Sequence, residues 1–389
     1  ISFGAAVIFN DANGSQFGIT FDSNVNKVVI TYKDSGNSSQ GTAIVGTVDP
    51  SDNSISFGSE EVFETGSTSY TSPTFDSSNN KVVIAYSDAG NSDKGKAVVG
   101  TISGTDITFG TIVQFEAGAT DNISATFDSD SNKVVIAYRD NGNSSYGKAI
   151  VGTVSGTNIS FGTEVVFESA NSNFISATFD SNVNKIVIAY YDGGNSGHGT
   201  AIVGTVSNTA ITFGSAAVFK AASSQYTQVV FDSSTNNVIL AYQNAFGGPG
   251  TVRTATVSGT GIGSFGTEVP FESSSTESIK LSFDSTSDRA VATYFDGGST
   301  GAATISVIQG QGSIPNLTSE NFIGFANGAA SDTGTARVQI GSGINGAQSS
   351  LTAGQQYFVQ TDGTIGLTAD DPSVIAGTAV SATDIIVKG

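Results

Sequence analysis

Polar side chains suited to binding recur in one loop that the sequence repeats four times. The loop reads DSGNSSQG, DAGNSDKG, DNGNSSYG and DGGNSGHG, beginning at Asp34, Asp88, Asp140 and Asp192. Each copy carries an amide at the same place, supplied by Asn37, Asn91, Asn143 and Asn195. Amides, hydroxyls and carboxylates together suit the recognition of a polar ligand such as a glycan. The same residue types also build turns, in which Asp and Asn bind local N–H groups and Gly adopts positive φ, and this structural interpretation is the simpler one.

Three aromatic residues stand at one place in the repeat, five residues before the Phe of an FD motif: Tyr70, Phe174 and Tyr226. Sugars stack on aromatic rings, so these side chains are candidates for a binding surface. The alternative is burial between neighbouring repeats, which the size of the rings favours.

One segment has the opening pattern of a calcium-binding loop. Asp128, Asp130 and Asn132 follow the D-x-D-x-N spacing of such loops. The segment lacks the Gly and the bidentate Glu that complete a calcium loop, and no other repeat carries the second Asp. We therefore expect no metal and no other cofactor, with calcium at these three residues as the alternative.

These residues belong to a long internal repeat. The Phe of the FD motif recurs after 54, 52, 52, 52 and 52 residues, at Phe21, Phe75, Phe127, Phe179, Phe231 and Phe283. Each period holds four short runs rich in β-branched residues, and four strands in about 50 residues make one blade of a β-propeller. The sequence therefore predicts an all-β protein with a six-bladed β-propeller over residues 1–310.

The composition of the four runs predicts their order within a blade. The run 123–128 carries the small residues Ser124, Ala125 and Thr126, which suit the narrow inner position. Residues 133–140 are apolar on both faces and suit a strand buried on both sides. Residues 148–154 and 158–167 then follow toward the outside. The last blade lacks its fourth run, and residues 1–9 match it. We expect this N-terminal strand to close the ring and remove its open edges.

This order places the loops on two faces. The turns on one face begin with an Asp that can bind the N–H groups of its own turn, at Asp22, Asp76, Asp128, Asp180, Asp232 and Asp284. The repeated DxGNS loops and the loops between blades lie on the other face, around the mouth of a central channel. Outer strands end there in Glu64, Glu116, Glu168 and Glu272. We therefore expect an acidic surface, rich in amides and hydroxyls, on that face.

The repeats do not bring together the residues of a known catalytic arrangement. The single histidine, His198, lies in one of the repeated loops, and nothing in the pattern places a nucleophile beside it. The loops resemble the Asp-box turns of sialidase-like propellers but lack their Trp. Sialidases need clustered arginines, whereas here they fall on different blades, at Arg139, Arg253 and Arg289. Paired carboxylates for glycoside hydrolysis are an alternative among so many acids, but we expect a protein that is not an enzyme.

Composition limits the class of partner. Lys and Arg number 15 against 34 Asp and Glu, and the resulting net charge of −19 repels the phosphate backbone of nucleic acids. No apolar run reaches the roughly 20 residues of a membrane-spanning helix, so we expect no membrane insertion. The chain has no Cys, which excludes disulfides and thiol-bound metals. It has no Met either, so we expect a processed chain or a fragment.

After a Gly-rich linker at residues 309–315, the repeat ends. Strand-like runs at 321–326, 336–341, 356–360, 364–368 and 373–387, the last with a break, predict a small β domain over residues 311–389. We expect this domain to serve for attachment or oligomerisation.

Both parts of the chain resemble a known group of proteins. The C-terminal stretches LTSENFIGFA, SLTAGQQYFVQTDG and AGTAVSATDIIVKG, together with the repeats, resemble tail-fibre and other virion-surface proteins of marine, often cyanobacterial, phages. The resemblance implies a non-enzymatic appendage or decoration protein at the virion surface or outside the cell. It also implies other virion proteins and a host-surface glycan or protein as partners. A secreted or cell-surface bacterial adhesin or lectin is the alternative, and a glycan-cleaving enzyme is a further one.

Overall fold

The chain is all-β, as the sequence predicts. The computed structural model describes residues 4–11, 13–298, 302–309, 325–326, 338–339, 344–346, 348–359, 365–368 and 375–387. Within these ranges the only helical elements are two three-residue 3-10 turns, η1 (Ala89–Asn91) and η2 (Gly193–Asn195). In this part of the chain no helix has the length and apolar character to cross a membrane. Two compact units, Ile1–Gly310 and Gln311–Gly389, make up the chain.

The first unit consists of repeated antiparallel sheets, which we call blades. Blade 1 contains β1 (Gly14–Asp22), β2 (Lys27–Asp34), β3 (Gln40–Asp49) and the start of β4 (Ser54–Asp76). Blade 2 contains the end of β4, β5 (Lys81–Asp88), β6 (Lys94–Ser103), β7 (Asp106–Phe109) and the start of β8 (Val113–Asp128). Blade 3 contains the end of β8, β9 (Lys133–Asp140), β10 (Tyr146–Ser155), β11 (Asn158–Phe161) and the start of β12 (Val165–Asp180).

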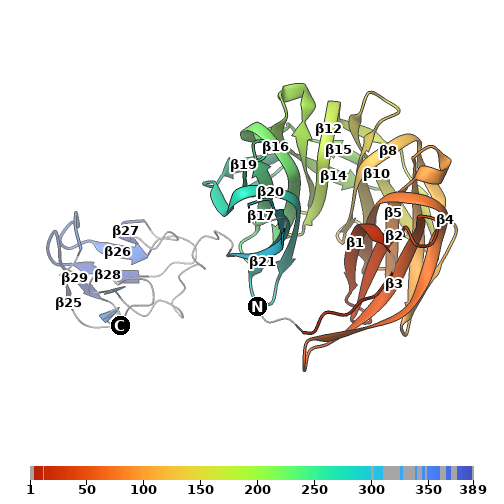
Figure 1. The fold of residues 1–389 in the computed structure, drawn as a ribbon. Coiled ribbons are helices and arrows are strands. Elements are labelled where there is room, and N and C mark those ends of the chain that lie inside the picture. The colour runs from red at the N-terminus through yellow and green to blue at the C-terminus, as the bar shows by residue number, and fades with distance from the viewer. Residues whose placement is uncertain are drawn as a thin grey trace. The chain divides into compact units, whose positions relative to one another are not determined.

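The last three blades follow the same plan. Blade 4 contains the end of β12, β13 (Lys185–Asp192), β14 (His198–Ser207), β15 (Ala210–Phe213) and the start of β16 (Ala217–Asp232). Blade 5 contains the end of β16, β17 (Asn237–Asn244), β18 (Pro249–Ser258), β19 (Gly261–Phe265) and the start of β20 (Val269–Asp284). Blade 6 contains the end of β20, β21 (Arg289–Asp296) and β22 (Ala302–Gln309). Figure 1 shows the blades following one another around a central space.

Neighbouring blades share a continuous strand, so the prediction of loops between blades is wrong. We call β4, β8, β12, β16 and β20 the crossover strands, because each leaves the outer edge of one blade and becomes the inner strand of the next. A bulge allows this passage: in β12 the register shifts between Asn173 and Ser176, and Phe174 adopts φ 51°. The same left-handed conformation recurs at Gln16, Tyr70, Asn122, Tyr226 and Ser278.

The predicted order of strands within a blade is confirmed. Residues of the inner strands, among them Ser124 and Ala177, line a central cavity of about 700 Å³. The second strand of each complete blade is buried on both faces; in β9, Val134 to Tyr138 are all inaccessible to solvent. Small residues therefore take the narrow inner position, and large apolar residues fill the middle of the blade.

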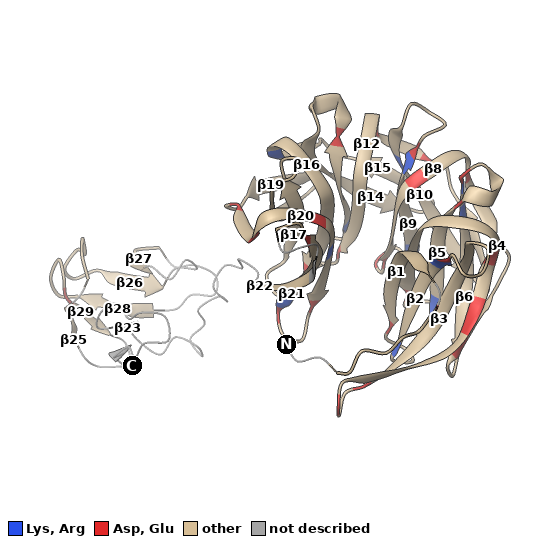
Figure 2. Cartoon of the chain, in the orientation of Figure 1, with Lys and Arg blue, Asp and Glu red and all other residues tan. Residues whose placement is uncertain are grey.

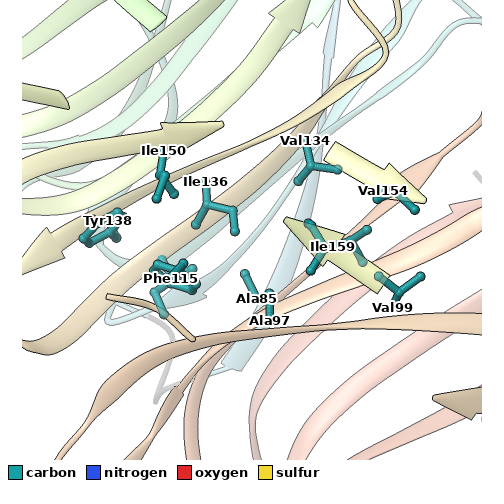
Figure 3. Close-up of a cluster of buried hydrophobic side chains, with 12 residues drawn as sticks. Ala85, Ala97, Val99, Phe115, Val134, Ile136, Tyr138, Ile150, Val154 and Ile159 are labelled. Atoms are coloured by element: carbon teal, nitrogen blue, oxygen red, sulfur yellow. The ribbon is translucent and has the colours of Figure 1, made fainter. Parts of the chain in front are cut away.

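The hydrophobic core lies between blades. Figure 3 shows Ala85 and Ala97 of blade 2 in one cluster with Ile136 and Ile150 of blade 3, and Phe115 of the crossover strand beside them. The Phe115 ring lies 5.2 Å from the Tyr138 ring and 5.8 Å from the Phe161 ring, measured between centroids. Similar clusters fill the other four interfaces between consecutive blades. Blades 2 to 5 are therefore each held mainly by their two neighbours.

Closure of the ring by the N-terminal strand is not confirmed. Residues 1–3 lie outside the described part of the chain, residues 4–10 form no strand, and β22 pairs with β21 alone among the described strands. The segment is held instead by side-chain contacts with blade 1. The Phe9 ring centroid lies 5.5 Å from those of Tyr32 and Phe57. Because these contacts involve rings and not the peptide groups of β22, they fix the segment without making it a strand of blade 6.

The second unit has a small sheet in the order β25 (Ile344–Asn345), β29 (Ile385–Val387), β28 (Ile375–Ala379), β26 (Gln356–Val359) and β27 (Ile365–Gly366). A separate pair joins β23 (Phe325–Ala326) to β24 (Val338–Gln339). The core of the second unit contains Leu351, Tyr357, Val359, Ala376, Ala379 and Ile385. The sequence anticipates all of these strands except β25, which lies in the Gly-rich stretch GSGINGA and falls outside the predicted runs.

Candidate functional site

The DxGNS loops and the bulges of the crossover strands meet on one face, which we call the loop face. Backbone hydrogen bonds join them: Asn141 N donates to Ala119 O at 2.7 Å, and Ser172 N donates to Ser145 O at 3.1 Å. The predicted placement of these segments on a common face is therefore confirmed.

The DxGNS loops fold as turns closed by their leading Asp. In three loops the Oδ1 of this Asp accepts a hydrogen bond from the backbone N of the Asn three residues later, at 3.1 to 3.2 Å. The pairs are Asp34 with Asn37, Asp140 with Asn143 and Asp192 with Asn195. In blade 2, Asn91 ends the 3-10 turn η1. The side chains of all four asparagines are exposed, and in the described part of the chain they make no hydrogen bond. Their backbone builds the turn, while their amides face outward.

The expectation of an acidic loop face is wrong. The leading Asp of each loop is buried; Asp140, for example, is 3% exposed. Lys148 Nζ lies 2.7 Å from Asp140 Oδ2 and 3.3 Å from Glu116 Oε2, which also accepts from the Tyr138 hydroxyl at 3.1 Å. Figure 2 shows Asp and Glu at both ends of the blades instead of gathered at one. Most of the carboxylates predicted for the surface are buried, whereas Glu168 and Glu272 remain partly exposed.

The protonation of these buried acids depends on the lysine. Burial opposes the charged form of Glu116, but the Gly118 N–H and the Lys148 ammonium together lower the pKa of its carboxyl. In blade 4 the equivalent residue is Thr200, which pairs with Tyr190 as Lys148 pairs with Tyr138. There, burial and the neighbouring Asp192 carboxylate raise the pKa of Glu168.

The aromatic candidates occupy the left-handed position of the bulges, with φ of 51° to 52°. The rings of Phe174 and Tyr226 lie in contact, with centroids 4.9 Å apart, and both residues are half-buried. Tyr70 is 38% exposed and stands two blades before Phe174, with Asn122 at this position in the blade between them. The structure thus brings two of the three predicted residues together and leaves the third apart.

A polar cluster that sequence reasoning missed adjoins this aromatic pair. The Arg139 guanidinium donates through Nε to Asp121 Oδ1 at 2.6 Å and also binds Asn173 of the crossover strand. Asn141 Nδ2 donates to Asp121 Oδ2 at 2.8 Å. Asn122 accepts from the Phe174 backbone N at 2.7 Å, which links the cluster to the aromatic pair. The one sequence signal is Arg139 itself, which stands where other blades carry Ser87 and Tyr191.

The calcium candidates are occupied by the turn in which they lie. Asp128 Oδ1 accepts from the backbone N of Asp130 and of Ser131, both at 3.0 Å, and its Oδ2 accepts from the Ser131 hydroxyl at 2.7 Å. Asn132 Oδ1 accepts from the Ser78 hydroxyl of the preceding blade. Nowhere in the described ranges do three or more His, Cys, Asp or Glu side chains gather as metal ligands would. The other five Asp of this kind bind their turns as predicted.

The candidates for catalysis do not come together. The His198 side chain makes no hydrogen bond within the described residues, although its backbone pairs with Asp192. Arg139 binds Asp121, Arg253 lies over the Phe265 ring, and Arg289 donates to the backbone of its own turn.

Comparison with known proteins gives the fold alone. No protein-family model matches the chain, and no curated protein matches its sequence. A protein of unknown function from Dyadobacter fermentans DSM 18053 has a TM-score of 0.52 at 10% identity, over 76% of this chain and 93% of that one. AofleA from Arthrobotrys oligospora has a TM-score of 0.50 at 7% identity, over 76% and 82%. A leech intramolecular trans-sialidase complexed with 2,7-anhydro-Neu5Ac has a TM-score of 0.49 at 7% identity, over 79% and 70%.

Proposed function

We propose that this chain is a non-enzymatic binding protein that recognises a carbohydrate on a cell surface through its loop face. The observation that carries the proposal is the contact of Phe174 with Tyr226 beside the Arg139 cluster. Partly exposed rings stack against the C–H face of a sugar, while amides and a guanidinium bind its hydroxyls. Asp121 fixes the guanidinium in place, so little conformational freedom is lost on binding.

The surroundings of this site support a carbohydrate over a charged ligand. Several buried Asp and Glu near it are bound to tyrosines, lysines or turn N–H groups. The exposed groups of the DxGNS loops therefore include the neutral amides of all four asparagines, beside the one exposed carboxylate of Asp93. Binding sites commonly lie on loops carried by a rigid scaffold. Here the scaffold is the set of crossover strands.

We propose that the protein acts at the surface of a virion, as an appendage or decoration protein. The resemblance of both sequence parts to phage tail-fibre and virion-surface proteins supports this role. In this proposal the second unit binds other virion proteins or another copy of the chain. The second candidate is a secreted or cell-surface bacterial adhesin or lectin. Both candidates use the same loop face, and they differ in whether the protein is found on purified particles.

We also propose that the first unit is a six-bladed propeller whose seam is completed by the N-terminal segment. Phe9 contacts Tyr32 and Phe57 as Phe63 contacts Tyr86 and Phe109 one blade further on. Apolar side chains are also exposed on both sides of the seam: Val7, Ile8, Ile305 and Val307. Pairing of the two edges would cover them.

The binding proposal is tested by a glycan array and by adsorption of labelled protein to marine bacterial cells. The variant Phe174→Ala/Tyr226→Ala removes the aromatic pair. The matched control is Phe21→Ala, an aromatic residue that is 53% exposed on the opposite face. We expect the double variant to lose at least tenfold in affinity and the control to bind normally. Equal binding by the folded double variant, or no binding by the parent protein, would contradict the proposal.

A further inference from the structure

The central cavity has mainly apolar walls and one charged side chain among the described residues that line it. It has a volume of about 700 Å³, within the range of small-molecule sites. Its walls are mainly apolar, with Ile123, Ile175 and Val229 among the lining residues, and hydroxyls such as those of Thr71 and Thr178 lie between them. Lys280 is the one ionisable side chain among the described residues that line it.

Lys280 stands at a repeated position, three residues before the FD Phe. The series around the cavity is Gly18, Ser72, Ser124, Ser176, Gln228 and Lys280. The serines tie neighbouring inner strands together: Ser124 Oγ accepts from Ala177 N at 2.9 Å, and Ser176 Oγ accepts from Val229 N at 3.1 Å. An ammonium group has no lone pair with which to accept such a bond. Lys280 therefore does not continue the structural role of the serines.

The ammonium of Lys280 has no counter-ion in the described part of the chain, although the protein carries a net charge of −19. Three other lysines of the blades form ion pairs with acids: Lys96 with Asp88, Lys148 with Asp140 and Lys220 with Glu268. The Lys280 side chain is exposed to the cavity, and the surrounding protein desolvates its ammonium group and lowers its pKa. A cation kept away from the many acids of the chain is well placed to bind an incoming anion.

We propose that the central cavity binds a small organic monoanion with an apolar body, such as a monocarboxylate, whose charged group pairs with Lys280. The apolar walls take the body of the ligand, and burial of apolar surface supplies about 25 cal/mol per Å². The hydroxyls and Gln228 orient its polar end. This site is separate from the aromatic pair on the loop face, so the two proposals stand or fall independently.

Titration calorimetry with decanoate, and with decanol as its uncharged analogue, tests the proposal on the full chain. We expect the protein to bind decanoate at least tenfold more tightly than decanol. Lys280→Ser, which restores the residue of three other blades, should remove this preference and leave decanol binding unchanged. Lys81→Ser, which removes an equal charge from the turn between the inner and second strands of blade 2, should keep it.

Two results would overturn the proposal: no saturable binding of decanoate by the parent protein, or an unchanged preference for decanoate in the folded Lys280→Ser variant. If that variant does not fold, Lys280→Gln serves in its place, because blade 5 carries Gln228 at this position. Glycan binding by the same variants separates this outcome from the loop-face proposal, since neither change touches Phe174 or Tyr226.

Discussion

Individual residues at the buried acid clusters show how one substitution changes the chemistry of a repeated site. Blades 2 and 3 place an ammonium between an Asp and a Glu, from Lys96 and Lys148. Blade 4 has the same Asp and Glu but Thr200 in place of the lysine. Two buried carboxylates near one another without a cation are destabilising, because each disfavours ionisation of the other. Asp192 and Glu168 thus repeat the arrangement of blades 2 and 3 without the lysine that stabilises it there.

The first prediction follows from this comparison. Thr200→Lys should raise the free energy of unfolding at pH 7 by roughly 1 kcal/mol or more, since each unit by which a pKa falls is worth about 1.4 kcal/mol. Urea denaturation measures the change. Thr209→Lys adds the same charge on an exposed turn and should have little effect. The converse change, Lys148→Met, should cost about 3–5 kcal/mol by leaving buried carboxylates unpaired. A Thr200→Lys protein no more stable than the control would refute the comparison.

The second prediction concerns pH and the same residue. The raised pKa of Glu168 means that the folded state holds its proton more tightly than the unfolded state. This contribution to stability is present below the ordinary glutamate pKa of about 4.3 and is lost as the pH rises from there through the raised pKa of the folded state. A lysine at position 200 should lower this pKa, as Lys148 does for Glu116. The contribution of Glu168 to stability should then increase with rising pH instead of decreasing. The stabilisation by Thr200→Lys should thus grow between pH 4 and pH 7. A constant difference across this range would show that Glu168 is not the group responsible.

Sequence reasoning found the residues that repeat and missed those that do not. The turn-capping Asp residues recur six times, and their role was predictable because Asp binds its own turn in a known way. Arg139 and Lys280 each occur once, so no periodicity marks them. Their importance comes from neighbours on other strands, Asp121 and Asn173 for Arg139 and the cavity walls for Lys280. Such neighbours follow only from the folded arrangement.

Strands and their connections form the next scale. The 52-residue period predicts where the four strands of a blade lie, and the structure places them there in blades 1 to 5, as it does the first three strands of blade 6. The crossover strands were not predicted because the stretch between the outer and inner runs, such as ETGSTSY before Thr71, has the polar composition of a loop. Its backbone continues as a strand because the bulge at Tyr70 absorbs the change of direction. The polar composition of this stretch reflects its exposure to solvent and does not show which hydrogen bonds its backbone forms.

The third prediction tests the bonds between inner strands. Ser124→Ala removes the acceptor of the Ala177 N–H and should lower the free energy of unfolding by about 1 kcal/mol, whereas Ser129→Ala on an exposed turn should change little. The corresponding bond between blades 1 and 2 lacks both its acceptor and its donor. Gly18 has no hydroxyl, and Pro73 opposite it has no N–H. A Cβ at Gly18 would lie 2.3 Å from Pro73 Cδ.

The fourth prediction uses this pair. Gly18→Ser should destabilise the protein through the clash with Pro73, and adding Pro73→Ala should recover part of the loss by removing the ring and restoring the N–H. A double-mutant cycle in urea measures the coupling. Additive effects of the two changes would show that the glycine and the proline are independent.

At the scale of the whole first unit, the seam between blades 6 and 1 decides whether the ring is closed. In blade 3, Ala149 pairs with Val165. The corresponding residues at the seam are Ile305 and Val7, both exposed, at 43% and 45%.

The fifth prediction follows from this correspondence. The chain has no cysteine, so Val7→Cys/Ile305→Cys creates a unique pair. Under oxidation it should form a disulfide within one chain, seen as a mobility shift on non-reducing gels, and raise the melting temperature. Val7→Cys/Val25→Cys is the control, because Val25 lies on a turn of blade 1 that this pairing does not involve. Disulfides between chains only, or none, would refute the proposed closure.

The crossover strands also bear on how such a chain changes over generations. Since each of the five joins two blades in the same way, a genetic duplication or loss of 52 codons preserves every junction, wherever its endpoints fall within the repeat. Unequal recombination between the near-identical repeats can therefore add or remove one whole blade without creating a faulty boundary. The circumference would change, and with it the width of the central space, while the loop face would gain or lose one loop between strands. The gene thus carries a built-in means of altering the size and valency of its product in a single event.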